Sequence, residues 1–313
     1  MQLDTVGSPA MWAAFIVFVL AMLALDLGVF HKKAHIVGFK EAATWSVVWI
    51  SLALVFSGII WWQFGSKLGT EFLTGYLIEK SLSIDNIFVF VVIFASLKVP
   101  PLYQHRVLFW GILGALVMRA AMIFAGVAML ERFHWLIYIF GAFLIFTGIR
   151  MLKDAGPSDP EQSAFMKLVR RVLPTSKEYD GDKFFTKQNA KWVATPLFMA
   201  LILVEVTDVI FALDSIPAIF AVTRDPFIVF TCNIFAILGL RSLFFLLAGM
   251  VDRFAYLKIG LAAVLVFVGL KMALIDLGKI PSAISLLVIM AMLGSSIGAS
   301  LWKSRKKDAV RAV

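Results

Sequence analysis

Glu79-Lys80-Ser81-Leu82-Ser83-Ile84-Asp85-Asn86 (79–86) is the stretch that decides the fold, because it places charged and polar residues inside a long apolar segment. A second apolar segment carries a similar pattern at 205–216, Glu205-Val206-Thr207-Asp208-Val209-Ile210-Phe211-Ala212-Leu213-Asp214-Ser215-Ile216. Asp208 precedes Asp214 by six residues, just as Glu79 precedes Asp85. A spaced pair of acids that recurs in two apolar segments indicates an internal duplication.

The composition around these segments is that of an integral membrane protein. Of 313 residues 61% are hydrophobic, and the mean hydropathy is +0.92, whereas soluble domains are about 45–50% apolar. Many apolar runs reach the roughly 20 residues that a helix needs to cross the hydrocarbon core. We therefore predict an all-α polytopic membrane protein with about nine transmembrane helices, at 10–30, 43–63, 72–96, 107–130, 134–152, 194–222, 226–249, 255–275 and 281–302.

Positive charge alternates between the predicted loops. The net charge of +9 does not indicate nucleic-acid binding here, because cytoplasmic loops of membrane proteins carry an excess of Lys and Arg. Most Lys and Arg residues fall in every second loop, above all in 153–193 and after residue 302. We expect a periplasmic N-terminus and a cytoplasmic C-terminus. The long loop should be cytoplasmic, with an amphipathic helix at 160–173 and a small hairpin at 183–192.

The duplication extends beyond the two acidic segments. Met118-Arg119 in the next predicted helix corresponds to Leu240-Arg241, and Thr147-Gly148-Ile149 corresponds to Val268-Gly269-Leu270. The two blocks lie three helices apart, so they have opposite orientations in the membrane, which is typical of transporters. We predict two N-terminal helices (1–65), a first three-helix repeat (66–152), the cytoplasmic loop (153–193), an inverted three-helix repeat (194–276), and a last helix with a basic tail (277–313).

Acidic side chains inside the predicted spans are the candidate site residues. Each costs about 2.5–3.5 kcal/mol at a helix centre unless it is paired, protonated or facing water, and a bound cation is the simplest compensation. Glu79, Ser83 and Asn86 follow the spacing i, i+4, i+7 and share one helix face. The predicted cation ligands are Glu79, Asp85, Asn86, Glu205, Asp208, Asp214 and Ser215, with Ser83 and Asp26 as further candidates.

Asp85 and Asp214 lie about 120° away from that face in a straight helix, which leaves two interpretations. Either the helices are unwound near 84–87 and 213–217, where Pro217 removes a backbone hydrogen bond, or the two aspartates have a second role. Arg119 and Arg241 also allow two interpretations. In the simpler one, each pairs with Asp85 or Asp214 and braces the repeat interface. In the other, arginine competes with the ion for a carboxylate and couples binding to rearrangement.

The ligand chemistry favours a hard cation. Carboxylate and carbonyl oxygens suit Mn²⁺, Mg²⁺ and Ca²⁺, whereas Zn²⁺ and Cu⁺ favour imidazole or thiolate, and no Cys or His lies among these acids. Carboxylates also bind protons, so exchange of metal for protons at the same groups is chemically natural. The sequence contains no phosphate-binding loop and no recognisable catalytic constellation, so we expect neither an enzyme nor a resident cofactor. A passive cation channel and a membrane scaffold that delivers metal through partners are the alternatives.

The motifs resemble those of the TerC/Alx family of bacterial membrane proteins. The resemblance rests on 75–86, on 205–218 and on Leu25-Asp26-Leu27-Gly28-Val29-Phe30-His31 (25–31), and it extends over nearly the whole chain. Residues 201–247 look especially like the Alx branch. The resemblance implies a nine-span fold related to the LysE-type exporters, location in the inner membrane, and Mn²⁺ efflux, with links to alkaline pH and tellurite resistance. The preference for Mn²⁺ over Ca²⁺ or Mg²⁺ comes from this resemblance alone, and the sequence does not set the oligomeric state.

Overall fold

The computed structural model describes residues 5–28, 37–133, 135–153, 174–176, 178–188, 191–248, 256–274, 276 and 280–311. Helices dominate these residues, and a two-stranded hairpin accompanies them. The helices are α1 (Pro9–Gly28), α2 (Phe39–Phe64), α3 (Ser66–Ser96), α4 (Pro101–Arg132), α5 (Leu136–Lys153), α7 (Pro196–Phe220), α8 (Pro226–Leu238), α9 (Leu240–Leu247), α10 (Leu257–Ala273) and α11 (Ser282–Arg311). The hairpin consists of β1 (Phe185–Gln188) and β2 (Lys191–Ala194).

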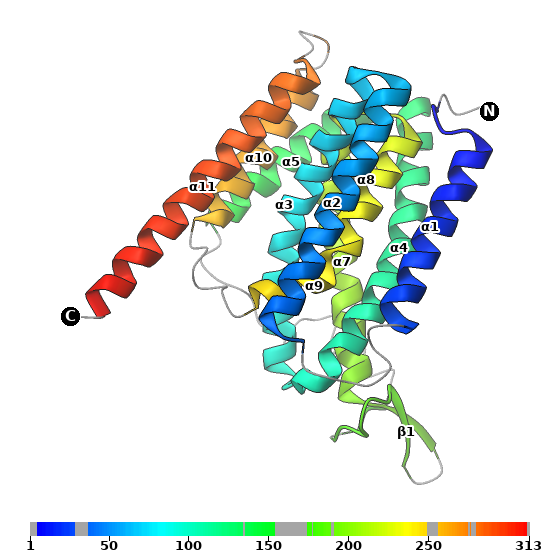
Figure 1. The fold of residues 1–313 in the computed structure, drawn as a ribbon, viewed down its shortest axis with the longest axis vertical. Coiled ribbons are helices and arrows are strands. Elements are labelled where there is room, and N and C mark those ends of the chain that lie inside the picture. The colour runs from blue at the N-terminus through cyan, green and yellow to red at the C-terminus, as the bar shows by residue number, and fades with distance from the viewer. Residues whose placement is uncertain are drawn as a thin grey trace.

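Two long helices, α3 and α7, pack against each other inside the helix bundle. Helices α2, α4 and α8 pack around them, α1 lies along one side, and α5, α10 and α11 form an inclined group on the other side (Figure 1). Helix α8 is apolar except for Thr231 and Asn233 and is buried along its length, as expected for a helix enclosed by others. Helix α1 begins at the opposite end of the bundle from the hairpin (Figure 1).

The surface and length of the helices suit a lipid environment. Among the described residues, five segments are long and apolar enough to cross a membrane: Phe39–Phe64, Pro101–Leu130, Pro196–Phe220, Pro226–Leu247 and Ala283–Lys303. Large apolar side chains such as Trp62 and Leu287 are exposed on the outside of the bundle, which in a membrane protein is the lipid-facing surface. The chain is therefore an all-α, multi-pass integral membrane protein.

Several helix boundaries differ from the sequence-based prediction. Helix α3 begins at Ser66 rather than at 72, directly after a turn at Gly65, which has φ 89°. Helix α4 begins at Pro101 rather than at 107, because proline fits the first turn of a helix. Helix α11 continues to Arg311 rather than ending at 302, since polar residues at a helix end do not oppose helix formation in water.

The predicted span 226–249 is two helices, α8 and α9, separated at Gly239. A Cβ atom on Gly239 would lie 2.7 Å from Lys80 Nζ and 3.1 Å from Trp49 Cβ. Lys80 Nζ donates a hydrogen bond to the carbonyl of Ala236 at 3.2 Å, and so satisfies one of the carbonyls that a helix end leaves free. Neighbouring side chains therefore stabilise the break, which the apolar sequence did not predict.

Helices α3 and α7 are continuous where unwinding was one of the two interpretations. Both remain helical through 84–87 and 213–217. Pro217 lies in the last turns of α7, where its missing donor leaves only the carbonyl of Leu213 without a helical partner. The unwinding interpretation is therefore wrong.

Glycines bring α5 and α10 into close contact. A Cβ atom on Gly141 would lie 2.9 Å from the carbonyl oxygen of Gly269, and one on Gly148 would lie 2.8 Å from that of Ala262. Small residues allow membrane helices to approach each other closely. Helices α5 and α10 thus form one tightly packed pair.

The predicted hairpin in the long loop is confirmed. Strands β1 and β2 are antiparallel, with Gln188 opposite Lys191. Thr195 Oγ1 donates to the carbonyl of Lys183 at 2.7 Å, and Arg106 of α4 forms a salt bridge with Asp182. The hairpin is thereby attached to the ends of α4 and α7. The amphipathic helix predicted at 160–173 lies outside the described residues.

Candidate cation site

Arg119 of α4 lies inside the bundle between two carboxylates from different helices. Its Nε and Nη2 donate to Oδ2 and Oδ1 of Asp208 on α7 at 3.0 and 2.8 Å. Its Nη1 donates to Oε1 of Glu79 on α3. The side chains of Arg119 and Glu79 are each 1% exposed, and that of Asp208 is 4% exposed. The guanidinium therefore joins the two acidic segments; we call Arg119, Glu79 and Asp208 the triad.

Two neutral side chains complete the surroundings of the guanidinium. Ser215 Oγ lies 3.5 Å and Asn233 Oδ1 lies 3.4 Å from Arg119 Nη1. Ser215 was a predicted ligand, but Asn233 of α8 was missed. The signal was present, because Asn233 is the one amide side chain in α8 and is completely buried. An amide inside an apolar helix that packs among others needs a polar partner.

The triad is stable only as a unit. A buried ion pair gains little over apolar residues, but removing one partner leaves an uncompensated charge and costs about 3–5 kcal/mol. With both carboxylates ionised, the two acids contribute −2 and the arginine +1, so the formal charge is −1. The triad therefore stays attractive to cations even with the arginine in place.

The face of α3 that carries Glu79 presents further oxygens. Glu79 Oε2, Ser83 Oγ and Asn86 Oδ1 are buried and have no hydrogen-bond partner within the part of the chain that the structure describes. Each of the three residues is 1% exposed, and their spacing places them on one face, as predicted. We call this set the α3 stripe. Buried acceptors without donors are unfavourable, so the stripe is suited to a positive ligand.

A cavity of ≈ 430 Å³ lies beside the triad and the α3 stripe, between α3, α5, α7 and α10. Arg150 near the end of α5 and Lys258 near the start of α10 also line it. The cavity thus connects the buried acids with one end of the α5–α10 pair. Its polar wall near the acids consists of Glu79, Asn86, Arg119, Thr147, Asp214 and Ser215.

Other predicted site residues lie apart from this cavity or outside the described part of the chain. Glu205 is one turn from Asp208, but its carboxylate packs so closely on Gly114 of α4 that no side chain would fit at 114. Asp85 and Asp26 lie on α3 and α1, and their side chains fall outside the described residues.

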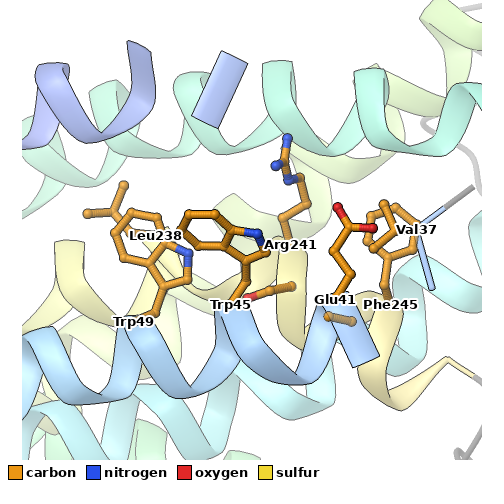
Figure 2. Close-up of a pocket in the computed structure, with 9 residues that line it drawn as sticks. Val37, Glu41, Trp45, Trp49, Leu238, Arg241 and Phe245 are labelled. Carbon is orange, nitrogen blue, oxygen red and sulfur yellow. The ribbon is translucent and has the colours of Figure 1, made fainter. Parts of the chain in front are cut away.

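Of the two interpretations for the arginines, the simpler one needs correction for Arg119. Arg119 was expected to pair with Asp85 or Asp214, but the carboxylates that hold it are Glu79 and Asp208. Arg241, the residue that the sequence correspondence pairs with Arg119, lines a separate pocket of ≈ 20 Å³. Figure 2 shows Glu41, Trp45 and Trp49 projecting from one helix into that pocket, where Arg241 also lies. The helix is interrupted at Gly239 just before Arg241, which is consistent with the different surroundings of these two arginines.

The carboxylates do not form a preassembled metal site in this structure. Among the residues that the structure describes, no three His, Cys, Asp or Glu side chains gather in a way that could hold a metal ion. Oxygens of Glu79, Asp208 and Ser215, which the sequence assigned to a cation, surround the guanidinium of Arg119 instead. A metal ion would need a rearrangement of these groups in order to bind.

Residues 64–308 match the Integral membrane protein TerC family. The chain belongs to the TerC family. It is 67% identical over 302 residues to the uncharacterised membrane protein STKORF319 of Myxococcus xanthus, with 96% of this chain and 95% of the relative covered. It is 46% identical over 319 residues to Alx of Escherichia coli K12, whose name describes a candidate membrane-bound redox modulator, with 99% of each chain covered. No solved structure matches the chain.

The TerC match and the site coincide. The matched region of this TerC-family protein contains the whole triad, the α3 stripe and the cavity wall. Helix α1 and most of α2 precede the match, whereas the similarity to Alx covers them as well. The resemblance to the TerC/Alx family inferred from the acidic motifs is confirmed.

Proposed function

We propose that this TerC-family protein is a secondary transporter that exports a divalent cation, Mn²⁺, across the bacterial inner membrane in exchange for protons. The observation that carries the proposal is the meeting of Glu79 and Asp208, buried on two different helices beside a cavity. Acidic residues in membrane helices are unfavourable and mark ion or proton pathways. In this proposal the protein binds and moves an ion and catalyses no covalent reaction.

The oxygens around the cavity support a hard divalent ion. Asp214, Asn86 and Ser215 add to the two carboxylates of the triad, and carboxylate, amide and hydroxyl oxygens suit Mn²⁺, Mg²⁺ and Ca²⁺. The resemblance to the TerC/Alx family favours Mn²⁺ among these three. Because a ligating carboxylate must lose its proton, metal binding releases protons, which provides the chemical basis for exchange.

Two contacts in the bundle core support an inverted repeat and, with it, nine spans and alternating access. In the sequence correspondence, Gly111 of α4 is the counterpart of Cys232 of α8, to within one residue. Val204 of α7 is the counterpart of Gly75 of α3. A Cβ atom on Gly111 would lie 2.8 Å from Val204 Cγ1, and one on Gly75 would lie 2.9 Å from Cys232 Sγ. An inverted repeat produces such paired contacts, and its halves can exchange conformations around one site.

The same correspondence applies to the α5–α10 pair. It relates Gly148 to Gly269 and Ala262 to Gly141, so the close contact Gly148–Ala262 is the counterpart of Gly269–Gly141. We infer that this pair is a common element of both halves. Movement of α5 and α10 against α3 and α7 would then open or close the cavity between them.

A flux assay tests the proposed function. Purified protein in liposomes should accumulate Mn²⁺ above its equilibrium concentration when a pH gradient is imposed, and a protonophore should abolish the accumulation. Protein-free liposomes are the control. Flux that equilibrates Mn²⁺ regardless of the pH gradient would identify a channel, and an absence of protein-dependent flux would remove the transport proposal in favour of a scaffold.

Thiol labelling tests the direction in which the cavity opens. Arg150 and Lys258 belong to the loops that charge assigns to the cytoplasm, so Thr147→Cys in the cavity wall should react with an impermeant maleimide from the cytoplasmic side only. Cys232 is the one cysteine of the chain and is buried, so Cys232→Ala gives a clean background. Lys67→Cys, in a pocket formed by α3 and the end of α7, should react only from the periplasmic side. Labelling of Thr147→Cys from the periplasm would contradict the assignment.

A further inference from the structure

We propose that Arg119 is a tethered counter-ion, which holds Glu79 and Asp208 when no cation is bound and which a divalent cation must displace. This inference rests on the proposed function and deepens it, because it names the residue that sets ion selectivity. Arginine keeps its positive charge inside proteins. It therefore competes with the transported ion in every state in which both are near the carboxylates.

The first support is the way in which Asp208 is bound. The Nε and Nη2 atoms of Arg119 occupy both carboxylate oxygens, at 3.0 and 2.8 Å. This two-point arrangement is the strongest form of an arginine–carboxylate contact. A cation that takes an oxygen of Asp208 as a ligand would lie close to the positive guanidinium, and the repulsion between the two charges favours loss of at least one of these bonds.

The second support is the α3 stripe, which lies next to the guanidinium and is not satisfied by it. Arg119 uses only Oε1 of Glu79, whereas Glu79 Oε2, Ser83 Oγ and Asn86 Oδ1 remain buried without a partner in the described residues. Within the described part of the chain, these atoms are buried oxygens that lack a donor or a positive charge, and Glu79 Oε2 is the one that belongs to the triad. The cation would bind first at this stripe and then compete with Arg119 for Glu79.

The third support is the presence of neutral groups that can receive the displaced guanidinium. Asn233 Oδ1 and Ser215 Oγ already lie 3.4 and 3.5 Å from Nη1. They are weaker partners than carboxylates, because hydrogen bonds to ionised groups are roughly twice as strong as neutral ones. Displacement is therefore unfavourable unless the incoming ion gains more than the arginine loses.

Selectivity follows from this competition. A monovalent ion would replace one positive charge by another and leave a buried arginine without its carboxylates. A divalent ion brings twice the charge to the same oxygens and can outweigh that loss. Arg119 thus excludes Na⁺ and K⁺ from a site whose ligands alone would accept them.

Metal binding to the purified full-length protein in nanodiscs tests the inference, with Mn²⁺ alone as the probe and electron paramagnetic resonance to count free ion. Arg119→Gln should bind Mn²⁺ about tenfold more tightly than the wild type, because no guanidinium competes for Glu79 and Asp208; tenfold corresponds to about 1.4 kcal/mol. Na⁺ should weaken Mn²⁺ binding to this variant and leave the wild type unaffected. Added Mn²⁺ should also raise the unfolding temperature of Arg119→Gln more than that of the wild type.

Arg241→Gln is the matched control, because it removes a buried arginine that lies in the separate pocket; its Mn²⁺ affinity should equal that of the wild type. If Arg119→Gln does not fold, Arg119→Lys provides the test instead. A lysine cannot bind both oxygens of Asp208 at once, so the Mn²⁺ affinity of this variant should be higher than that of the wild type. Equal or weaker Mn²⁺ binding by the folded variants would overturn the inference. Failure of the proposed function looks different, because the wild type itself would then transport no Mn²⁺ in liposomes.

Discussion

Asp208→Asn is expected to reduce Mn²⁺ efflux from loaded proteoliposomes by about 100-fold. The substitution keeps the size of the side chain but removes one of the two charges that α3 and α7 bring together. Mutation of even an outer-shell partner of a metal ligand typically costs about 10–100-fold in metal affinity or activity, so loss of a charged ligand should cost about 100-fold. The triad changes from a formal charge of −1 to 0, so Arg119 keeps Glu79 as a partner and the protein should still fold. Initial rates of Mn²⁺ release measure the effect.

Asp180→Asn is the matched control for this experiment. Asp180 is an exposed carboxylate beside the hairpin, where it accepts hydrogen bonds from Thr186 at 2.8 Å and Lys183 at 3.2 Å. Its loss should leave the efflux rate within a factor of about two, because exposed ion pairs contribute little. Wild-type efflux by folded Asp208→Asn protein would show that the ion does not use this carboxylate.

Gly269→Ala should destabilise the protein and separate the α5–α10 pair. The added Cβ would lie 2.7 Å from the carbonyl oxygen of Gly141 and 3.0 Å from the amide nitrogen of Ile145, and backbone atoms cannot move aside as a flexible side chain can. Overpacking of this kind costs about 1–3 kcal/mol. The unfolding temperature should fall by about 2–10 °C in a protein of this size, as measured by thermal unfolding in detergent.

The same substitution at Gly294 should not destabilise the protein. Gly294 lies in α11, and a Cβ atom there would meet nothing within 4 Å. Alanine favours a helix over glycine by about 1 kcal/mol, so Gly294→Ala should leave stability unchanged or raise it slightly. If both variants unfold at the same temperature, the close contact between α5 and α10 does not require a glycine at 269.

Much of the fold could be predicted from the sequence because apolar runs of membrane length leave few alternatives. Every predicted span corresponds to helix over most of its length, and the hairpin at 183–192 is present. The break at Gly239 could not be predicted, because it depends on Lys80 and Trp49 from other helices. The sequence left open whether α7 is unwound near Pro217, and the helix is continuous because a proline near a helix end disturbs few hydrogen bonds.

The site could be predicted in part. The spacing of Glu79, Ser83 and Asn86 gave the correct helix face, and Glu79 and Asp208 do approach the same group. The sequence could not tell which acids Arg119 contacts, because this depends on how α4 is rotated against α3 and α7. Asn233 was missed because the comparison of the two halves followed charged residues. Its counterpart in α4 is the glycine or isoleucine at 111–112, so no polar residue recurs there to draw attention to it.

If the protein is the proposed transporter with two inverted halves, the helix break at Gly239 affects the relative energies of its inward-facing and outward-facing forms. Two identical halves would make the inward-facing and outward-facing forms equal in energy, since exchanging the halves would return the same molecule. Here one half supplies Arg119 to the carboxylates, while the other keeps Arg241 beside Glu41 and two tryptophans. In the proposed transporter the two forms are then unequal in energy, and we expect the protein without a bound ion to face one compartment for most of the time.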